Sequence, residues 1–182
     1  MSKTKKPRLL LLSDLWGNDK SDWICFYTAI LEEHFELKYY DCCELGSIDK
    51  TLYSEEALHN QFINGGIEKA VEQLLHQETA TINILGFSIG GLIGWKAGNS
   101  GLKIEKLFAL SSTRLRYETQ KPAAYIKLFY GENDNYKPDS DWFEKFDLKE
   151  NFFQNENHEF YQKKENALII CDKIIESLKL KI

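Results

Sequence analysis

Short apolar runs alternate with stretches of helical periodicity along the chain, and this alternation limits the fold more than any other feature. Six runs predict strands, at 8–13, 35–41, 81–86, 106–112, 125–131 and 151–154. Helices are predicted around 21–33, 54–77, 89–99 and 140–146, with a last one at about 163–180. Strands separated by helices pair in parallel. The order therefore predicts an α/β three-layer sandwich: a mostly parallel sheet of about six strands with helices on both faces.

Length and charge narrow the class of protein. The 182 residues suffice for one sizeable core and are too few for two, so one domain over 1–182 is expected. Apolar residues make up 43% and charged residues 28% of the chain, which is ordinary globular usage. The net charge of −5 argues against a nucleic-acid partner.

The first residues are basic and are followed by leucines, as in a secretory signal, but the apolar run ends after four residues at Ser13 and Asp14. A secretory signal needs a longer run. No later segment approaches the roughly eighteen apolar residues that span a bilayer. A cytoplasmic location without a membrane partner is therefore expected.

The cysteines indicate neither a metal site nor a redox pair. Cys25, Cys42, Cys43 and Cys171 lack paired metal-ligand spacing and a Cys-x-x-Cys pattern. We expect reduced thiols, with no metal and no cofactor. Cys25 and Cys171 fall within helical periodicity, where burial as small hydrophobic residues is expected.

One serine stands at a sharp strand-to-helix turn. The β-branched run at 81–85 breaks into Gly86-Phe87-Ser88-Ile89-Gly90, and a helical stretch follows. Small residues two positions either side of the serine let strand and helix pass closely and expose its hydroxyl, as in a nucleophile elbow. Ser88 is the candidate nucleophile; a glycine-rich turn without chemistry is the alternative.

A serine nucleophile needs a base held by a carboxylate, and elbow proteins supply them in the order Ser, Asp or Glu, His. Asp134 lies three residues after the glycine that ends the strand at 125–131, so its carboxylate is expected at the same sheet edge as Ser88. Glu132, Asp139 and Asp141 are competitors that we interpret as solvated loop charges.

His158 is the candidate base. It follows the strand-like run at 151–154 through a polar turn and precedes the last helix, which lets the imidazole return over Ser88. His34, His59 and His76 lie in or beside predicted helices upstream of Ser88, where surface or packing roles are expected.

Three segments together resemble the α/β-hydrolase superfamily: GFSIGG at 86–91, GENDNYKP at 131–138 and NHEF at 157–160. The likeness spans nearly the whole chain and implies a minimal, cap-less version of that fold. Within the family the acid follows a Gly-x-x-Asp-x-x-x-Pro pattern and the histidine precedes the last helix. The resemblance implies a catalytic triad of Ser88, Asp134 and His158.

The resemblance also implies two backbone amides that stabilise an oxyanion, those of Ile89 and Leu15. Ser13-Asp14 stands where the family usually has His-Gly. A carboxylate beside a developing oxyanion would oppose it. Either Asp14 points away from the site, or activity is weak.

The chain has no room for a large lid between Ser88 and Asp134, so we expect a shallow pocket, or one covered by neighbouring loops, and a small substrate. Arg114 and Arg116 lie in the connection at 113–124, where they would hold an anionic acyl group or guide an acyl carrier, or would simply be solvated. Trp16 is a pocket candidate.

Trp23 is a second pocket candidate, with helix packing as at least an equal alternative. The last helix repeats apolar residues at 168, 169, 170, 174, 175 and 178, a spacing that predicts packing on the sheet.

The leading functional hypothesis is serine-dependent hydrolysis of a small carboxylic ester or thioester through an acyl-enzyme. The alternative is a binding or regulatory protein of hydrolase shape with little turnover. A nucleotide-phosphate site at the glycine-rich turn is disfavoured, because the turn lacks the Lys-Ser/Thr ending of a P-loop and the Gly-x-Gly-x-x-Gly pattern.

Overall fold

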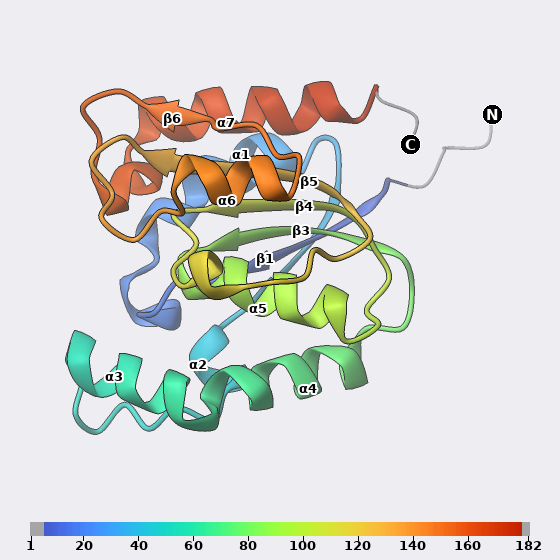
Figure 1. The fold of residues 1–182 in the computed structure, drawn as a ribbon. Helices are drawn as coiled ribbons and strands as arrows, with labels where there is room; N and C mark the ends of the chain where they lie inside the picture. Colours follow the sequence, from blue (N-terminus) through green and yellow to red (C-terminus); the bar gives the residue numbers. More distant parts are fainter. Residues whose placement is uncertain (1–5, 180–182) are drawn as a thin grey trace.

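The computed structural model describes residues 6–179 and contains a six-stranded sheet in which neighbouring strands run parallel (Figure 1). Its strand order is β2-β1-β3-β4-β5-β6. The strands are β1 (Arg8–Leu12), β2 (Glu36–Tyr40), β3 (Ile82–Phe87), β4 (Ile104–Leu110), β5 (Tyr125–Gly131) and β6 (Phe152–Phe153). The predicted parallel sheet of about six strands is confirmed.

Helices fill the connections between the strands. The α-helices are α1 (Cys25–Leu31), α2 (Cys42–Leu45), α3 (Glu55–Gln61), α4 (Ile67–Gln77), α5 (Ile89–Asn99), α6 (Ser140–Lys145) and α7 (Lys164–Ser177). Short 3-10 helices are η1 (Gly17–Lys20), η2 (Asp22–Ile24), η4 (Leu115–Tyr117) and η5 (His158–Gln162). The predicted last helix ends at Ser177, and residue 180 of that prediction lies outside the described residues.

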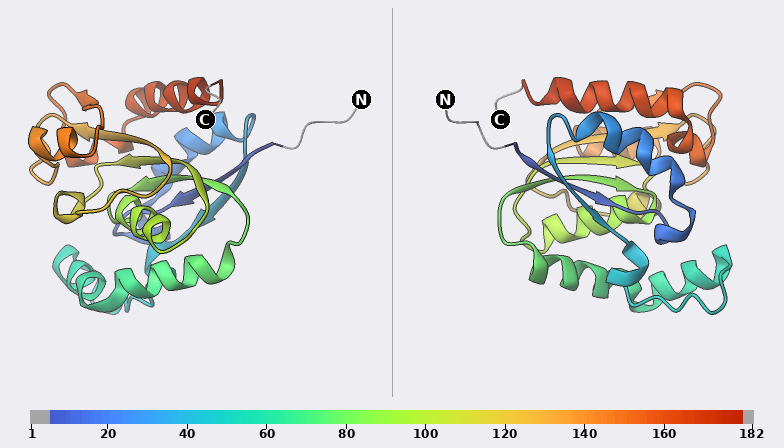
Figure 2. Two further views of the ribbon diagram at one scale, coloured as in Figure 1. Left: turned by 45° about the vertical axis from the view of Figure 1, so that its right-hand side comes forward. Right: turned by 180° about the vertical axis from the view of Figure 1, so that it is seen from behind.

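The sheet is covered on both faces, which confirms the three-layer sandwich (Figures 1 and 2). Successive strand residues point to opposite faces. Leu9 and Leu11 of β1 pack in the cluster that includes α1 and α7, while Leu10 and Leu12 pack in the cluster with α2, α4, α5 and α6. Because both faces are buried, the strands read as continuous apolar runs.

The inner face of α7 differs from the predicted one. Leu168 and Ile169 are exposed, whereas Ala167, Ile170 and Ile174 are buried. Asn166 is also on the inner side, where its amide donates to the carbonyl oxygen of Phe160 at 2.9 Å and to Glu156 Oε1 at 3.1 Å. Apolar residues at helical spacing form the buried face, namely Ala167, Ile170, Cys171 and Ile174, and Asn166 adds polar contacts at its first turn.

The connection between β2 and β3 carries α3 and α4, interrupted by the segment Phe62–Gly66. Gly65 has φ +114°, a backbone conformation that favours glycine. The interruption separates α4, which packs against α5, from α3, which extends toward the edge where the strands end (Figure 1).

Cys25 is exposed at the start of α1, so its predicted burial is wrong: the inner side of that helix presents Tyr27 and Leu31 instead. Between residues 6 and 179, every helix falls short of the length and apolar content that crossing a bilayer would require.

Candidate active site

Ser88 occupies the sharp turn that joins β3 to α5. Its backbone has φ +48° and ψ −114°, a strained conformation for a residue with a side chain. The Ser88 amide donates to the carbonyl oxygen of Leu110 at 2.8 Å, which ties the turn to the end of β4. The strain is thus held by the sheet edge, and Ser88 lines a cavity there.

Glycines beside the serine make this turn possible. A Cβ atom on Gly90 would lie 2.5 Å from the carbonyl oxygens of both Leu12 and Ser13. One on Gly86 would lie 2.6 Å from the amide nitrogen of Gly91. Only hydrogen fits at these positions, so α5 can start directly against the ends of β1 and β3.

Ser88, His158 and Asp134 form one hydrogen-bonded chain. Ser88 Oγ lies 3.1 Å from His158 Nε2, and His158 Nδ1 lies 2.9 Å from Asp134 Oδ2. Ser88 and Asp134 are buried, and the His158 side chain is 19% exposed. An Nδ1–H that donates to the carboxylate leaves Nε2 to accept from the serine hydroxyl. The arrangement is one that can take a proton from Ser88.

The environment of Asp134 keeps its carboxylate ionised. Burial favours a higher pKa, but the hydrogen bond and charge of His158 and the Tyr136 amide together hold the pKa below its ordinary 3.8. The Tyr136 N–H donates to Asp134 Oδ1 at 2.8 Å. Both carboxylate oxygens therefore have donors, and the side chain is fixed in orientation.

The competing carboxylates serve other purposes. Glu132 accepts from the Asn155 amide at 2.9 Å, and Asp139 caps α6 by accepting from the Trp142 amide at 2.9 Å. Asp141 is exposed on α6. Of the four acidic residues in this region, Asp134 alone contacts His158 among the described residues.

The histidine loop, residues 154–157, returns His158 to the sheet edge through close backbone contact. A Cβ atom on Gly131, at the end of β5, would collide with the carbonyl oxygens of Asn157 and Glu156. The Ser111 hydroxyl donates to the carbonyl oxygen of His158 at 2.6 Å. The imidazole is thus held by the ends of β4 and β5.

Two backbone amides border the serine. Ile89 is the first residue of α5, and first-turn N–H groups have no acceptor within their helix. Leu15 lies in the β1 loop, residues 13–16, and its amide has no hydrogen-bond acceptor among residues 6–179. Both residues line the cavity with Ser88. Their role as the two oxyanion donors stays a prediction.

Asp14 is turned into the β1 loop and the histidine side of the pocket. Its Oδ1 accepts from the Trp16 amide at 3.0 Å, and its Oδ2 accepts from the Tyr161 hydroxyl at 3.0 Å. Burial raises its pKa from 3.8 to about 6, against the lowering effects of the Trp16 amide, the Tyr161 hydroxyl and the His158 charge. The carboxylate is buried and satisfied, yet it still borders the cavity.

Neither a protein-family model nor a curated protein matches this chain. Solved structures match it over nearly its full length. A proposed hydrolase of the α/β superfamily from Xanthomonas campestris pv. campestris aligns with a TM-score of 0.69 at 13% identity, over 94% of this chain and 99% of the other. The mouse alpha/beta hydrolase domain-containing protein 10 gives 0.67 at 12% identity, over 97% and 92%.

A third match is a serine hydrolase of the α/β class without a lid, from Xanthomonas campestris, with a TM-score of 0.63 at 15% identity over 100% of this chain and 87% of the other. This chain has the α/β-hydrolase fold. At such low identity the likeness shows the architecture. In this architecture Ser88 follows β3, Asp134 follows β5 and His158 follows β6.

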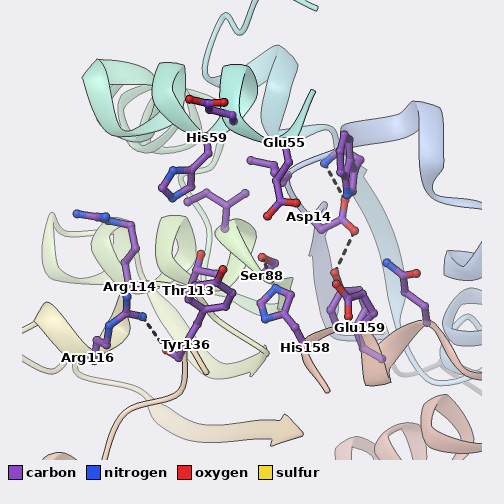
Figure 3. Close-up of a pocket in the computed structure, with 16 residues that line it drawn as sticks. Asp14, Glu55, His59, Ser88, Thr113, Arg114, Arg116, Tyr136, His158 and Glu159 are labelled. Atoms are coloured by element: carbon purple, nitrogen blue, oxygen red, sulfur yellow. Dashed lines mark hydrogen bonds between the residues drawn. The ribbon is translucent and has the colours of Figure 1, made fainter. Parts of the chain in front are cut away.

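The cavity of this α/β-hydrolase fold has a volume of about 630 Å³ (Figure 3). It is lined by Asp14, Leu15, Trp16, Glu55, Glu56, His59, Ser88, Ile89, Thr113, Arg114, Arg116, Tyr136, His158, Glu159, Tyr161 and Gln162. The predicted pocket residues Trp16, Arg114 and Arg116 are all among them. Trp23 is not; it packs against Tyr27, Phe87 and Tyr161.

Sequence reasoning missed the contribution of α3. Glu55 and His59, one helical turn apart, project from α3 over the site and face Ser88 across the cavity (Figure 3). The sequence predicts a surface or packing role for His59, and the structure places it in the pocket instead. Its spacing from Glu55 was a signal of a shared helix face, but the sequence did not indicate that the helix crosses the sheet edge.

Trp16 is held by aromatic and cationic contacts. Its ring lies edge-on to Tyr53 at 5.4 Å, and Lys20 Nζ lies 3.5 Å from its centre. The Tyr53 hydroxyl donates to the Trp16 carbonyl oxygen at 2.7 Å. These contacts fix the β1 loop, and with it the neighbouring amide of Leu15.

Proposed function

We propose that this chain is a serine hydrolase that cleaves a small carboxylic ester or thioester through an acyl-enzyme. The observation that carries the proposal is the hydrogen-bonded chain from Ser88 through His158 to Asp134 beside a cavity of about 630 Å³. A cavity of this size suits a small ligand. The lidless serine hydrolase that shares this fold supports the same class of activity.

In the acylation step, His158 Nε2 accepts the Ser88 hydroxyl proton while Oγ bonds to the carbonyl carbon. The carbonyl oxygen becomes an oxyanion, for which the amides of Ile89 and Leu15 are the candidate donors. The imidazolium that forms is stabilised by Asp134, whose pKa lies below its ordinary value. The oxyanion collapses, and His158 donates its proton to the departing alcohol or thiol.

In the deacylation step, water takes the place of the leaving group. His158 accepts one of its protons as the oxygen bonds to the acyl carbon. Collapse of the second oxyanion breaks the bond to Ser88 Oγ, which recovers its proton from His158. The products are a carboxylic acid and a free serine, so no cofactor is required.

The test is covalent labelling by a fluorophosphonate probe, combined with turnover of short-chain esters and thioesters. The native protein should be labelled, whereas Ser88→Ala should lose labelling and His158→Ala should be labelled much more slowly. Circular dichroism of each variant controls for folding. Labelling that persists in Ser88→Ala overturns the assignment of the nucleophile.

A second candidate is a binding protein of hydrolase shape with little turnover. Asp14 favours it, because a buried carboxylate next to Leu15 opposes an oxyanion at that amide. This candidate predicts saturable binding of a small ester without burst-phase release of alcohol. A burst that requires Ser88 contradicts it.

A further inference from the structure

Charged side chains of both signs line the pocket, namely two arginines and the carboxylates of Asp14, Glu55, Glu56 and Glu159. Arg114 and Arg116 lie on one side of Ser88 and His158, while Asp14, Glu55 and Glu159 lie on the other (Figure 3). We call the two arginines the cationic end of the pocket. A substrate bound at Ser88 therefore meets opposite charges in two directions.

The arginines of the cationic end are not neutralised by the protein. Neither forms an ion pair with a carboxylate among residues 6–179. Arg116 donates to the carbonyl oxygen of Tyr136 at 2.9 Å, and Arg114 lies 5.1 Å from the ring centre of Tyr117. These contacts orient the guanidinium groups and leave most of their donors free for an anion.

The backbone at Arg114 is also specialised. It has φ +67°, in the left-handed region that is uncommon for a residue with a side chain. The Tyr117 amide donates to the Arg114 carbonyl oxygen at 3.0 Å and closes the turn. The strain is consistent with a residue held for its position in the pocket.

His59 completes this end as a neutral group. Burial lowers its pKa below 6.5, and the positive charge of Arg114 lowers it further, against the opposing effect of Glu55. A neutral imidazole can donate or accept a hydrogen bond without adding charge. Arg114 and Arg116 therefore supply the positive charge at this end.

The strand order indicates which part of a substrate reaches Arg114. β3, which carries Ser88, lies between β1, which precedes Leu15, and β4, which precedes Arg114. At a tetrahedral carbon on Ser88, the oxyanion points toward Leu15 and Ile89, and the leaving group points toward the His158 proton. With those two directions occupied, the acyl chain extends toward the β4 side of the pocket.

We propose that the acyl group of the substrate carries one carboxylate or similar anion, which binds Arg114 on the β4 side of the pocket. The proposal rests on the serine hydrolase function proposed above. A second anion on the opposite side of the reacting carbonyl is disfavoured, because Glu55, Glu159 and Asp14 repel it. The substrate class is thus a small ester or thioester of a dicarboxylic half-acid or a related monoanion.

The test compares anionic and neutral esters of equal chain length. Monomethyl succinate, glutarate and adipate are paired with methyl butyrate, valerate and hexanoate, and hydrolysis is followed by proton release. The native protein should prefer the anionic ester in at least one pair. Arg114→Gln should reduce the anionic-to-neutral ratio of kcat/KM by about tenfold or more, which is the loss of one charge-assisted contact.

Matched variants separate the site from general electrostatics. Lys69→Gln removes the same charge from the exposed side of α4 and should leave the ratio unchanged. Arg114→Lys keeps the charge and should retain more of the preference than Arg114→Gln. A native preference for the neutral ester in all three pairs, or equal ratios for Arg114→Gln and Lys69→Gln, overturns the proposal.

Binding without turnover distinguishes this proposal from the serine hydrolase function. Calorimetry with monomethyl glutarate on Ser88→Ala should detect an affinity that falls in the Ser88→Ala, Arg114→Gln double variant. If the native protein neither hydrolyses the esters nor reacts with the fluorophosphonate, the proposed function fails, while this binding difference still supports the anion site. Equal binding by the single and double variants overturns the anion site whatever the activity.

Discussion

The Tyr161 hydroxyl donates a hydrogen bond to Asp14 Oδ2 at 3.0 Å, and both residues are buried. Asp14 belongs to the β1 loop, and Tyr161 lies three residues after His158 in η5. The contact joins the segment that carries Leu15 to the segment that carries the histidine. The relative position of the two halves of the site therefore depends on a carboxyl group that is costly to ionise.

This cost predicts a pH-dependent stability. Burial raises the pKa of Asp14 from 3.8 to about 6, so the native state binds this proton more tightly than the unfolded chain. The stability from that proton is present below pH 4 and is lost as the pH rises to about 6. Asp14→Asn removes the titration. The free energy of unfolding of the variant minus that of the native protein should therefore rise by roughly 2 to 3 kcal/mol from pH 4 to pH 7.5.

Urea unfolding at the two pH values measures this change. Asp141→Asn, which alters an exposed carboxylate on α6, is the control. A stability difference between Asp14→Asn and the native protein that is the same at both pH values contradicts the prediction.

Replacing Asp134 should impair catalysis more than folding. Asp134→Asn removes the carboxylate that fixes the Nδ1–H tautomer of His158 and should lower kcat by roughly 10³-fold or more. Because the pKa of Asp134 lies below 3.8, it stays ionised above that pH, and activity lost on acidification to pH 5 must come from another group. Asp139→Asn, which alters only the cap of α6, should keep kcat within about twofold. Steady-state hydrolysis of a short ester gives both values.

Much of the fold and the central geometry were predictable from local pattern. A buried parallel sheet gives continuous apolar strands, and the glycines around Ser88 are required by contacts with Leu12 and Ser13. Chain order then predicted that Asp134 and His158 would meet Ser88, because parallel strands end at one edge. These features depend on neighbours in sequence and on simple topology.

The features that escaped prediction depend on long-range contacts. The position of α3 over the site depends on what buries Leu58 of α3 and Phe62 just after it, and the sequence does not name those partners. On α7, Asn166 reaches Phe160 and Glu156 from the inner side, and a hydrophobic pattern does not include such polar contacts. The orientation of Asp14 required Tyr161, which is 147 positions away.

A buried ion-pair network at Glu78 should add stability that acid removes. Glu78 accepts from Arg8 at 2.6 Å, Lys38 at 2.9 Å and the Tyr40 hydroxyl at 2.5 Å. Burial favours a higher pKa, but these three partners lower it from 4.5 to about 2. The resulting stability, roughly 3 kcal/mol, is present above pH 4.5 and is lost as the pH falls toward 2.

Glu78→Gln should therefore destabilise the protein by roughly 2 to 3 kcal/mol at pH 7 and by much less at pH 2.5. Glu72→Gln, on the exposed side of α4, should change stability by less than about 0.5 kcal/mol. Thermal or urea unfolding at both pH values measures the difference. If Glu78→Gln destabilises the protein as much at pH 2.5 as at pH 7, Glu78 contributes through packing and not through its charge.

Two glycines of α5 should differ strongly in how much the same substitution costs. Gly90→Ala puts a methyl group 2.5 Å from the carbonyl oxygens of Leu12 and Ser13, which are fixed backbone atoms at the end of β1. It should cost roughly 2 kcal/mol or more, and should slow fluorophosphonate labelling because Ser88 and Ile89 move with the helix start. Gly94→Ala meets only side-chain methyl groups of Ile84 and Leu107, at 3.1 and 3.2 Å, so helix propensity offsets most of its cost. Melting temperatures and labelling rates of the two variants test this, and equal losses would mean that backbone contact at Gly90 does not set the position of the serine.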